Sequence, residues 1–179
     1  HGSSPHVGAE VHLSIEDFSH FLNTQVNALV GEDGVGLTVL LGPESDVGQL
    51  LAERRYYPGL QALRRWKQRV PPHRLAVEVV CHLTAPGEKL SVSHAVRMVR
   101  AAKETELAAI LSNAVRYREP AEAATADVLD AARTLTSLAT LKDLQTNAQG
   151  WLKPAHKMTA IAHEIAHHAG YGAYTARRL

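Results

Sequence analysis

The fold is decided by residues 75–81, whose sequence is LAVEVVC. Branched apolar residues dominate this run, which predicts a β-strand buried on both faces. Two similar runs lie on either side of it, LTVLL at 37–41 and LAAILS at 107–112. The stretches between the runs, 44–55, 57–70 and 91–104, have the residue pattern of helices. Strand and helix therefore alternate, and this order predicts an α/β fold in which crossover helices join parallel strands.

The rest of the chain is expected to be mainly helical. Apolar residues recur at helical spacing over 14–30, and the sequence from residue 119 onward also has helical character, over 121–136 and 155–169. Ser45 fits the N-cap of the short helix in 44–55. We therefore expect three parts: an N-terminal tail and helix (1–35), parallel strand and helix units (36–118), and a helical C-terminal part of the same domain (119–179).

The composition fits one ordinary globular domain of 179 residues, of which 45% are hydrophobic. The formal net charge of +1 neither favours nor excludes a nucleic-acid partner. The single cysteine, Cys81, excludes an internal disulfide and a zinc site built from cysteines. No apolar run reaches the roughly 18 residues needed to cross a membrane. No signal peptide is visible, so we expect a cytoplasmic protein without membrane contact.

The end of the second predicted strand carries a pair of candidate metal ligands. Glu78 and His82 would share one face of this strand, with Cys81 between them. A carboxylate and an imidazole there could bind a metal. The alternative is that both side chains form hydrogen bonds with neighbouring backbone groups. The third strand runs into SNAVRY, 112–117, which offers Asn113 and Arg116. Neither residue is a normal ligand for a catalytic metal.

A second candidate metal site is the H-E-x-x-H string formed by His163, Glu164 and His167. On a helix the two histidines share a face, so they could bind zinc while the glutamate acts as a general base. Position 173, where the longer pattern has a third histidine, is Ala173, so a third ligand would have to come from upstream, for example His156. The alternative is a chance match in an alanine-rich helix of a chain with 11 histidines.

Other common motifs are absent from the sequence. It contains no phosphate loop of the G-x-x-x-x-G-K-[ST] type, no G-x-G-x-x-G and no G-x-S-x-G. Two arginines followed by two tyrosines, at 54–57, could form a nucleic-acid surface, because phosphates pair with arginine and bases stack on aromatic rings. The alternative is a solvated helix end with two partly buried tyrosines.

Several segments occur in an order that resembles a known family: GLTVLLGPESDVGQLL (36–51), LAVEVVCHL (75–83), AAILSNAVRY (108–117), VLDAARTL (128–135) and NAQGWLKPAHKM (147–158). Together they resemble the polymerase-and-histidinol-phosphatase (PHP) domain of bacterial C-family DNA polymerases. These are the DNA polymerase III alpha subunit and its error-prone relative. The resemblance covers about residues 36–170. It implies a partial, distorted β/α barrel whose strand ends, in active members, hold metals for phosphoester hydrolysis or proofreading.

The chain departs from the family pattern in three respects. The H-x-H motif that opens a PHP domain is missing, since Val11-His12-Leu13 has only one histidine. The family's D-V-H-Y segment corresponds to residues 114–117, where Ala114 and Arg116 replace both ligands. Only Glu78 and His82 match ligand positions. The catalytic aspartates of the polymerase belong to a palm domain beyond Leu179. These departures, with a first residue that is not methionine, lead us to expect only the later part of the domain.

The resemblance therefore implies a fragment of a DNA-directed DNA polymerase, a nucleotidyltransferase of DNA replication or error-prone repair. In this fragment the PHP domain has lost its metal ligands and has a structural or accessory role, with Arg116 paired to Glu78 in place of the metal. Its partners would be the remainder of the polymerase chain, DNA through the parent protein, and a proofreading or accessory subunit. One alternative is an active phosphoesterase or exonuclease of the same fold that uses manganese or zinc. The other is the zinc peptidase at 163–167.

Overall fold

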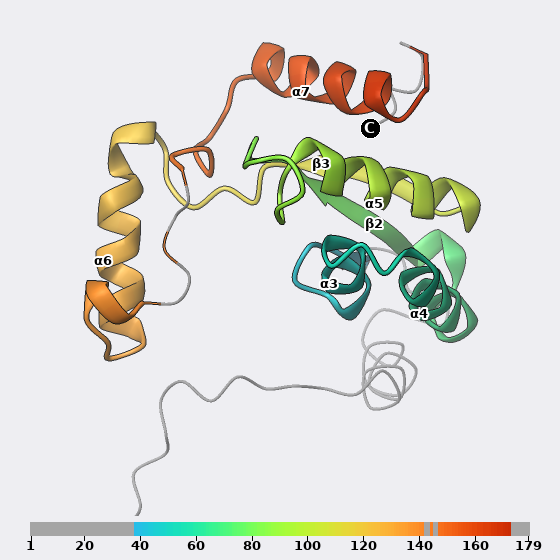
Figure 1. Ribbon diagram of the computed structural model, residues 1–179, viewed down its shortest axis with the longest axis horizontal. Helices are drawn as coiled ribbons and strands as arrows, with labels where there is room; N and C mark the ends of the chain where they lie inside the picture. The colour runs from blue at the N-terminus through green and yellow to red at the C-terminus, as the bar shows by residue number, and fades with distance from the viewer. Residues whose placement is uncertain (1–37, 142–143, 145–146, 173–179) are drawn as a thin grey trace, which may run out of the picture.

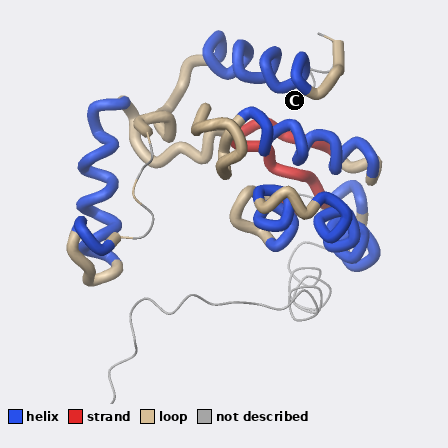
Figure 2. The backbone as a smooth tube through the Cα atoms, viewed as in Figure 1, coloured by secondary structure: helices blue, strands red, loops and turns tan. Residues whose placement is uncertain are grey.

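The computed structural model describes residues 38–141, 144 and 147–172. A three-stranded parallel sheet forms its centre, in the order β1 (Val39–Leu41), β2 (Leu75–Val80) and β3 (Ala108–Ser112). Figure 2 shows these strands in red, with helices around them. The predicted α/β class and parallel pairing are confirmed. The expected helix at 14–30 lies outside the described residues.

Helices fill both connections between the strands, as predicted. Two helices join β1 to β2, α3 (Asp46–Ala52) and α4 (Tyr56–Arg69), and one joins β2 to β3, α5 (Val92–Glu104). The C-terminal part contains α6 (Ala123–Arg133) and α7 (Ala155–His168). Short 3₁₀ turns complete the path: η2 (Pro72–Arg74), η3 (Pro120–Glu122) and η4 (Leu138–Thr140). The five helices of the described part of the chain begin and end within three residues of their expected bounds.

Serine caps fix the beginnings of two of these helices. Ser45 Oγ accepts a hydrogen bond from the Gly48 amide at 3.1 Å, which confirms the predicted N-cap of α3. Ser91 Oγ does the same for the His94 amide of α5, at 3.3 Å. Each cap satisfies an amide that the first helical turn leaves without a partner.

Four of the described helices, α3, α4, α5 and α7, cover one face of the sheet. The strands lie in the sheet in the order in which they occur in the chain. Because crossovers between parallel strands are right-handed, the connections β1–β2 and β2–β3 then lie on the same side of the sheet. On that side Leu41, Val77 and Val79 pack with residues of α3, α4, α5 and α7 in one core. Figure 1 shows α5 in front of β2, with α4 and α7 on either side of it.

The opposite face of the sheet is partly open. Its edge residues Leu40 and Ile110 are 45% and 40% exposed, while Ala76 and Val80 of the central strand are buried. The prediction that the first strand is buried on both faces is therefore wrong. The physical reason is the sequential strand order, because it leaves no described crossover helix on this side.

The C-terminal helices differ in how they pack. Ile161 and Ile165 of α7 are buried in the core beside α5. Figure 1 shows α6 at the edge of the molecule, away from the sheet, and two of its apolar side chains, Val128 and Leu129, are exposed. Among the described residues, no helix combines the length and apolar character that crossing a membrane requires.

Candidate functional site

The candidate site lies at the C-terminal edge of the sheet, where functional residues gather in parallel α/β folds. Glu78 of β2 points toward the ends of both neighbouring strands. The Ser112 hydroxyl at the end of β3 donates a 2.6 Å hydrogen bond to Glu78 Oε1. Gly42 follows β1, and a Cβ atom at this position would collide with Glu78 Oε2. The glycine therefore gives the carboxylate room to lie against the end of β1.

His82 lies two residues beyond the end of β2 and is buried. Its Nε2 atom is 2.9 Å from the Asn113 carbonyl oxygen. A carbonyl only accepts, so Nε2 carries a proton and donates it. Burial lowers the pKa of His82, and the nearby charge of Lys153 lowers it further, against the opposing effect of the Asn113 carbonyl. His82 is therefore a neutral imidazole that ties the end of β2 to the end of β3.

Glu78 and His82, which we expected to share one face of the strand, do not form one site. β2 ends at Val80, so the alternation of a strand does not extend to His82. The two side chains bond to different partners, the Ser112 hydroxyl and the Asn113 carbonyl. The alternative reading, in which neighbouring groups of the chain satisfy both residues, describes the geometry better.

The centre of the site is Asn113, which sequence reasoning noted only as a poor metal ligand. Its side-chain amide donates to the carbonyls of Gln149 and Trp151, at 2.9 and 2.6 Å. Its Oδ1 atom accepts a 2.9 Å hydrogen bond from Lys153 Nζ, which also donates to the Gln149 carbonyl. Asn113 thus uses its side chain and its carbonyl to join β2, β3 and the segment 147–153.

The segment 147–153 is attached at further points. The Asn147 side chain donates to the His82 carbonyl at 2.7 Å. Tyr117 and Trp151 form a parallel bridge, and the Gly150 amide donates to the Tyr117 hydroxyl at 3.1 Å. These contacts place the segment beside the continuation of β3.

Arg116 does not pair with Glu78, so that expectation is wrong. Its Nη2 atom donates to both carboxylate oxygens of Asp130 in α6, at 2.7 and 2.6 Å. The Arg116 amide donates to the Gly150 carbonyl at 2.8 Å, which ties the backbone here to the segment 147–153. The Asp130 side chain is 10% exposed and that of Arg116 is 41% exposed. Ala114, the other replaced ligand position, is exposed and has a φ of 41°.

These residues do not fit a divalent metal. Glu78 and His82 supply only one carboxylate and one imidazole, fewer than the three protein ligands of a catalytic zinc site. The charge of Lys153 acts on His82 and would oppose a second cation there. Within the described residues, no group of three or more His, Cys, Asp or Glu side chains could hold a metal ion.

Cys81 offers no nucleophile at this edge. It is buried in the core, and burial raises the pKa of its thiol, with a further rise from the nearby Glu164 charge. A buried thiol with a raised pKa is a poor nucleophile at neutral pH.

The H-E-x-x-H residues lie on the exposed side of α7. His163, Glu164 and His167 are all exposed, and the opposite side of the helix packs into the core through Ile165. His156, the suggested upstream ligand, is exposed on the same helix. Within residues 38–141, 144 and 147–172, these histidines belong to no group of side chains that could hold a metal ion. The arrangement fits the polar side of a packing helix.

Sequence reasoning missed the parts played by Lys153, Asp130 and Asn147. Asp130 is the carboxylate of VLDAARTL, and its side chain becomes buried. Its partner Arg116 lies 14 residues earlier, so the sequence around Asp130 did not indicate the ion pair. The chain matches no protein-family model and no curated protein. Any functional assignment therefore depends on the geometry described above.

Proposed function

We propose that this chain is part of a DNA polymerase III alpha-type subunit and forms the later part of its PHP domain, with a structural role. The proposal rests mainly on two cations at the strand ends, Lys153 bonded to Asn113 and Arg116 bonded to Asp130. A metal cluster at this edge would need carboxylates and imidazoles instead. The polar network takes the place of the metals, and it holds the strand ends together as bound ions would.

The strand order supports the expected partial, distorted β/α barrel. In such a barrel the strands follow chain order, the helices cover the outside, and the inner face is filled by side chains. The order β1-β2-β3 and the one-sided helices agree with this arrangement. The parallel bridge between Tyr117 and Trp151 continues the same order beyond β3. The open face at Leu40 and Ile110 is then the inside of the barrel, and other parts of the parent chain would complete it.

A second apolar surface supports a role in assembly. Val128 and Leu129 of α6 and Leu135 after it are exposed. Large exposed apolar side chains that lie close together commonly mark contacts with other protein surfaces. The remainder of the polymerase chain is the proposed partner here, or a proofreading or accessory subunit. Nucleotidyl transfer in replication or error-prone repair would belong to another domain of the parent.

Metal analysis tests the loss of the metal site. The 179-residue chain is dialysed against Mn²⁺ or Zn²⁺, and bound metal is measured by mass spectrometry beside nuclease and phosphatase assays. We expect much less than one metal per chain, no hydrolysis, and no change in Glu78→Gln or His82→Gln. Stoichiometric metal that both variants remove would establish the phosphoesterase instead. One zinc that only His163→Gln and His167→Gln remove would establish the peptidase.

The flanking coding sequence tests the proposed parent protein. We expect an H-x-H string to be encoded upstream of His1 and paired aspartates far downstream of Leu179. If an open reading frame of this length stands alone in the genome, the chain is not part of a polymerase. This test is independent of the metal analysis, since an inactive PHP-like domain could exist in either context.

A further inference from the structure

A basic groove of about 530 Å³ lies between α3 and α4. Its polar lining residues are three arginines, Arg55, Arg64 and Arg65, and two glutamines, Gln61 and Gln68. No carboxylate lines it. The groove is lined by none of the residues of the strand-end site, so a function here is separate from the proposed structural role.

The sequence of α4 creates this concentration of charge. Residues 61, 64, 65 and 68 are spaced by three or four, so they form one stripe about 10 Å long on the helix. The whole of α4 contains no acidic residue, while the net charge of the entire chain is only +1. The groove therefore has a local positive potential, although the net charge of the chain is nearly zero.

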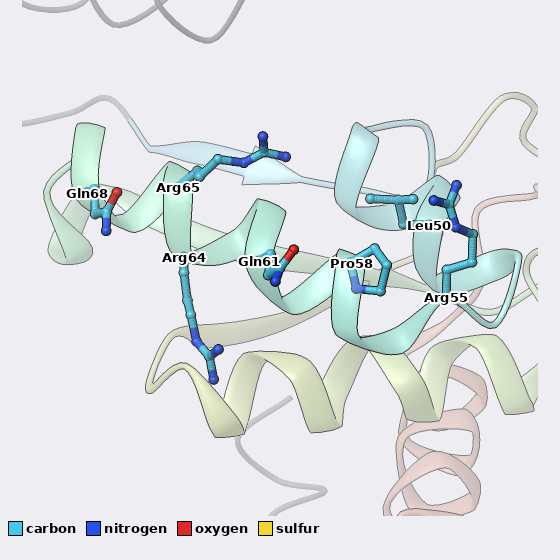
Figure 3. Close-up of a pocket in the computed structure, with 7 residues that line it drawn as sticks. All are labelled: Leu50, Arg55, Pro58, Gln61, Arg64, Arg65 and Gln68. Atoms are coloured by element: carbon cyan, nitrogen blue, oxygen red, sulfur yellow. The ribbon is translucent and has the colours of Figure 1, made fainter.

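The three arginines are held only weakly by the protein. Arg64 approaches Glu104 and Arg55 approaches Glu53, each at 3.5 Å between exposed side chains. Arg65 has no hydrogen-bond or ion-pair partner among the residues that the structure describes. Figure 3 shows Arg64 leaning toward α5 while Arg65 points away from it. Exposed ion pairs of this kind contribute little, so the guanidinium groups are free to bind an anion.

An aromatic side chain lies next to the groove. Tyr57 is 79% exposed and precedes Pro58, which lines the groove together with Leu50. The ring of its neighbour Tyr56 lies edge-on to that of Tyr57, with 6.3 Å between centroids, and the Tyr56 hydroxyl bonds to Glu104 at 3.2 Å. A basic groove that follows a phosphate backbone, with an exposed ring on which a base can stack, is the usual arrangement for single-stranded nucleic acid. Arginine and glutamine side chains are also common contacts to phosphate oxygens.

We propose that the α4 groove binds single-stranded nucleic acid, with phosphates on Arg55, Arg64 and Arg65 and a base stacked on Tyr57. Duplex nucleic acid fits less well, because its bases are paired and cannot stack on the ring. An anionic lipid surface fits less well too, since the groove has only Leu50 and Pro58 as apolar lining.

Fluorescence anisotropy with the full chain and a labelled single-stranded DNA of about twenty nucleotides tests the proposal. The groove variant Arg55→Gln/Arg65→Gln is compared with Arg118→Gln/Arg133→Gln, which removes the same charge from arginines whose side chains are 73% and 75% exposed outside the groove. Two lost phosphate contacts should weaken binding about tenfold at 0.1 M salt and lower the salt slope by about 1.4. The control pair should change neither quantity appreciably. Tyr57→Ala should weaken binding about fivefold or more.

Several results would overturn the proposal. One is absence of binding by the unaltered chain, and another is an equal loss of affinity in the groove and control variants. Tighter binding of a duplex of the same sequence would exclude single-strand recognition. Binding to vesicles of anionic phospholipid without binding to DNA would assign the groove to membranes. Circular dichroism and thermal melting establish that each variant is folded, and a change confined to exposed side chains should leave both unaltered.

Discussion

His94 is a fully buried histidine whose protonation should destabilise the fold. The Leu90 amide donates to His94 Nδ1 at 3.1 Å, so this nitrogen is unprotonated. Nε2 therefore carries the proton and donates it to the Gly48 carbonyl at 3.0 Å, which links α5 to α3. Burial lowers the pKa of His94 to about 4, against the opposing effect of the Gly48 carbonyl. A proton on Nδ1 would also break the bond from Leu90.

The size of the effect follows from proton linkage. An unfolded histidine takes up a proton near pH 6.5, and His94 in the folded chain does so only near pH 4. The unfolded state thus binds more protons between these values, so stability is full above pH 6.5 and is lost as the pH falls toward 4. The loss between pH 7 and pH 5 comes to about 2 kcal/mol in the free energy of unfolding.

Urea unfolding at pH 7, 6 and 5 measures this loss. The variant His94→Gln cannot titrate, and its amide can still donate to Gly48 and accept from Leu90. We expect its free energy of unfolding to fall about 2 kcal/mol less over this range than that of the original chain. His156→Gln, an exposed histidine of α7, is the control and should keep the original pH dependence. If His94→Gln also keeps it, the argument for a buried neutral His94 is refuted.

Substitutions at three further positions test packing, capping and the α6 contact. Asp130→Asn removes the ion pair to Arg116, and we expect faster hydrogen exchange in α6 while α5 is unaffected; equal protection of α6 in both proteins would contradict this. Ile165→Ala leaves a cavity beside α5 and should cost about 3 kcal/mol in urea unfolding, whereas a loss below about 1 kcal/mol would mean that α7 is not packed there. Ser45→Ala removes the cap on the Gly48 amide and should cost about 1 kcal/mol, and Ser45→Gly should recover most of it, since glycine is a tolerated cap.

Local patterns predicted the elements of this fold well because they act over short distances along the chain. The run at 75–81 is apolar and β-branched, and it forms the central strand. Ser45 caps a helix because its hydroxyl needs only to reach an amide three residues later. Ile161 and Ile165 face the core because helical spacing puts them on one side of α7.

Partners of the site residues were predicted less well, because these contacts join distant parts of the chain. The sequence offered Glu78 as a partner for Arg116, but in the folded chain the guanidinium donates to Asp130 of α6, 14 residues later. The two candidate ligands Glu78 and His82 likewise bond to different partners, Ser112 and the Asn113 carbonyl, and the strand ends between them.

The sequence by itself determined the alternation of strands and helices, the parallel class and the inward face of α7, since these follow from residue pattern and short-range geometry. Only the tertiary structure decided that α3, α4, α5 and α7 lie on one side of the sheet, that Asn113 joins the strand ends, and that Lys153 bonds to Asn113 there. The physical reason is that each of these depends on which segments meet after folding. A side chain bonds to the buried polar group that lies within about 3 Å of it after folding, and the local sequence pattern does not identify that group.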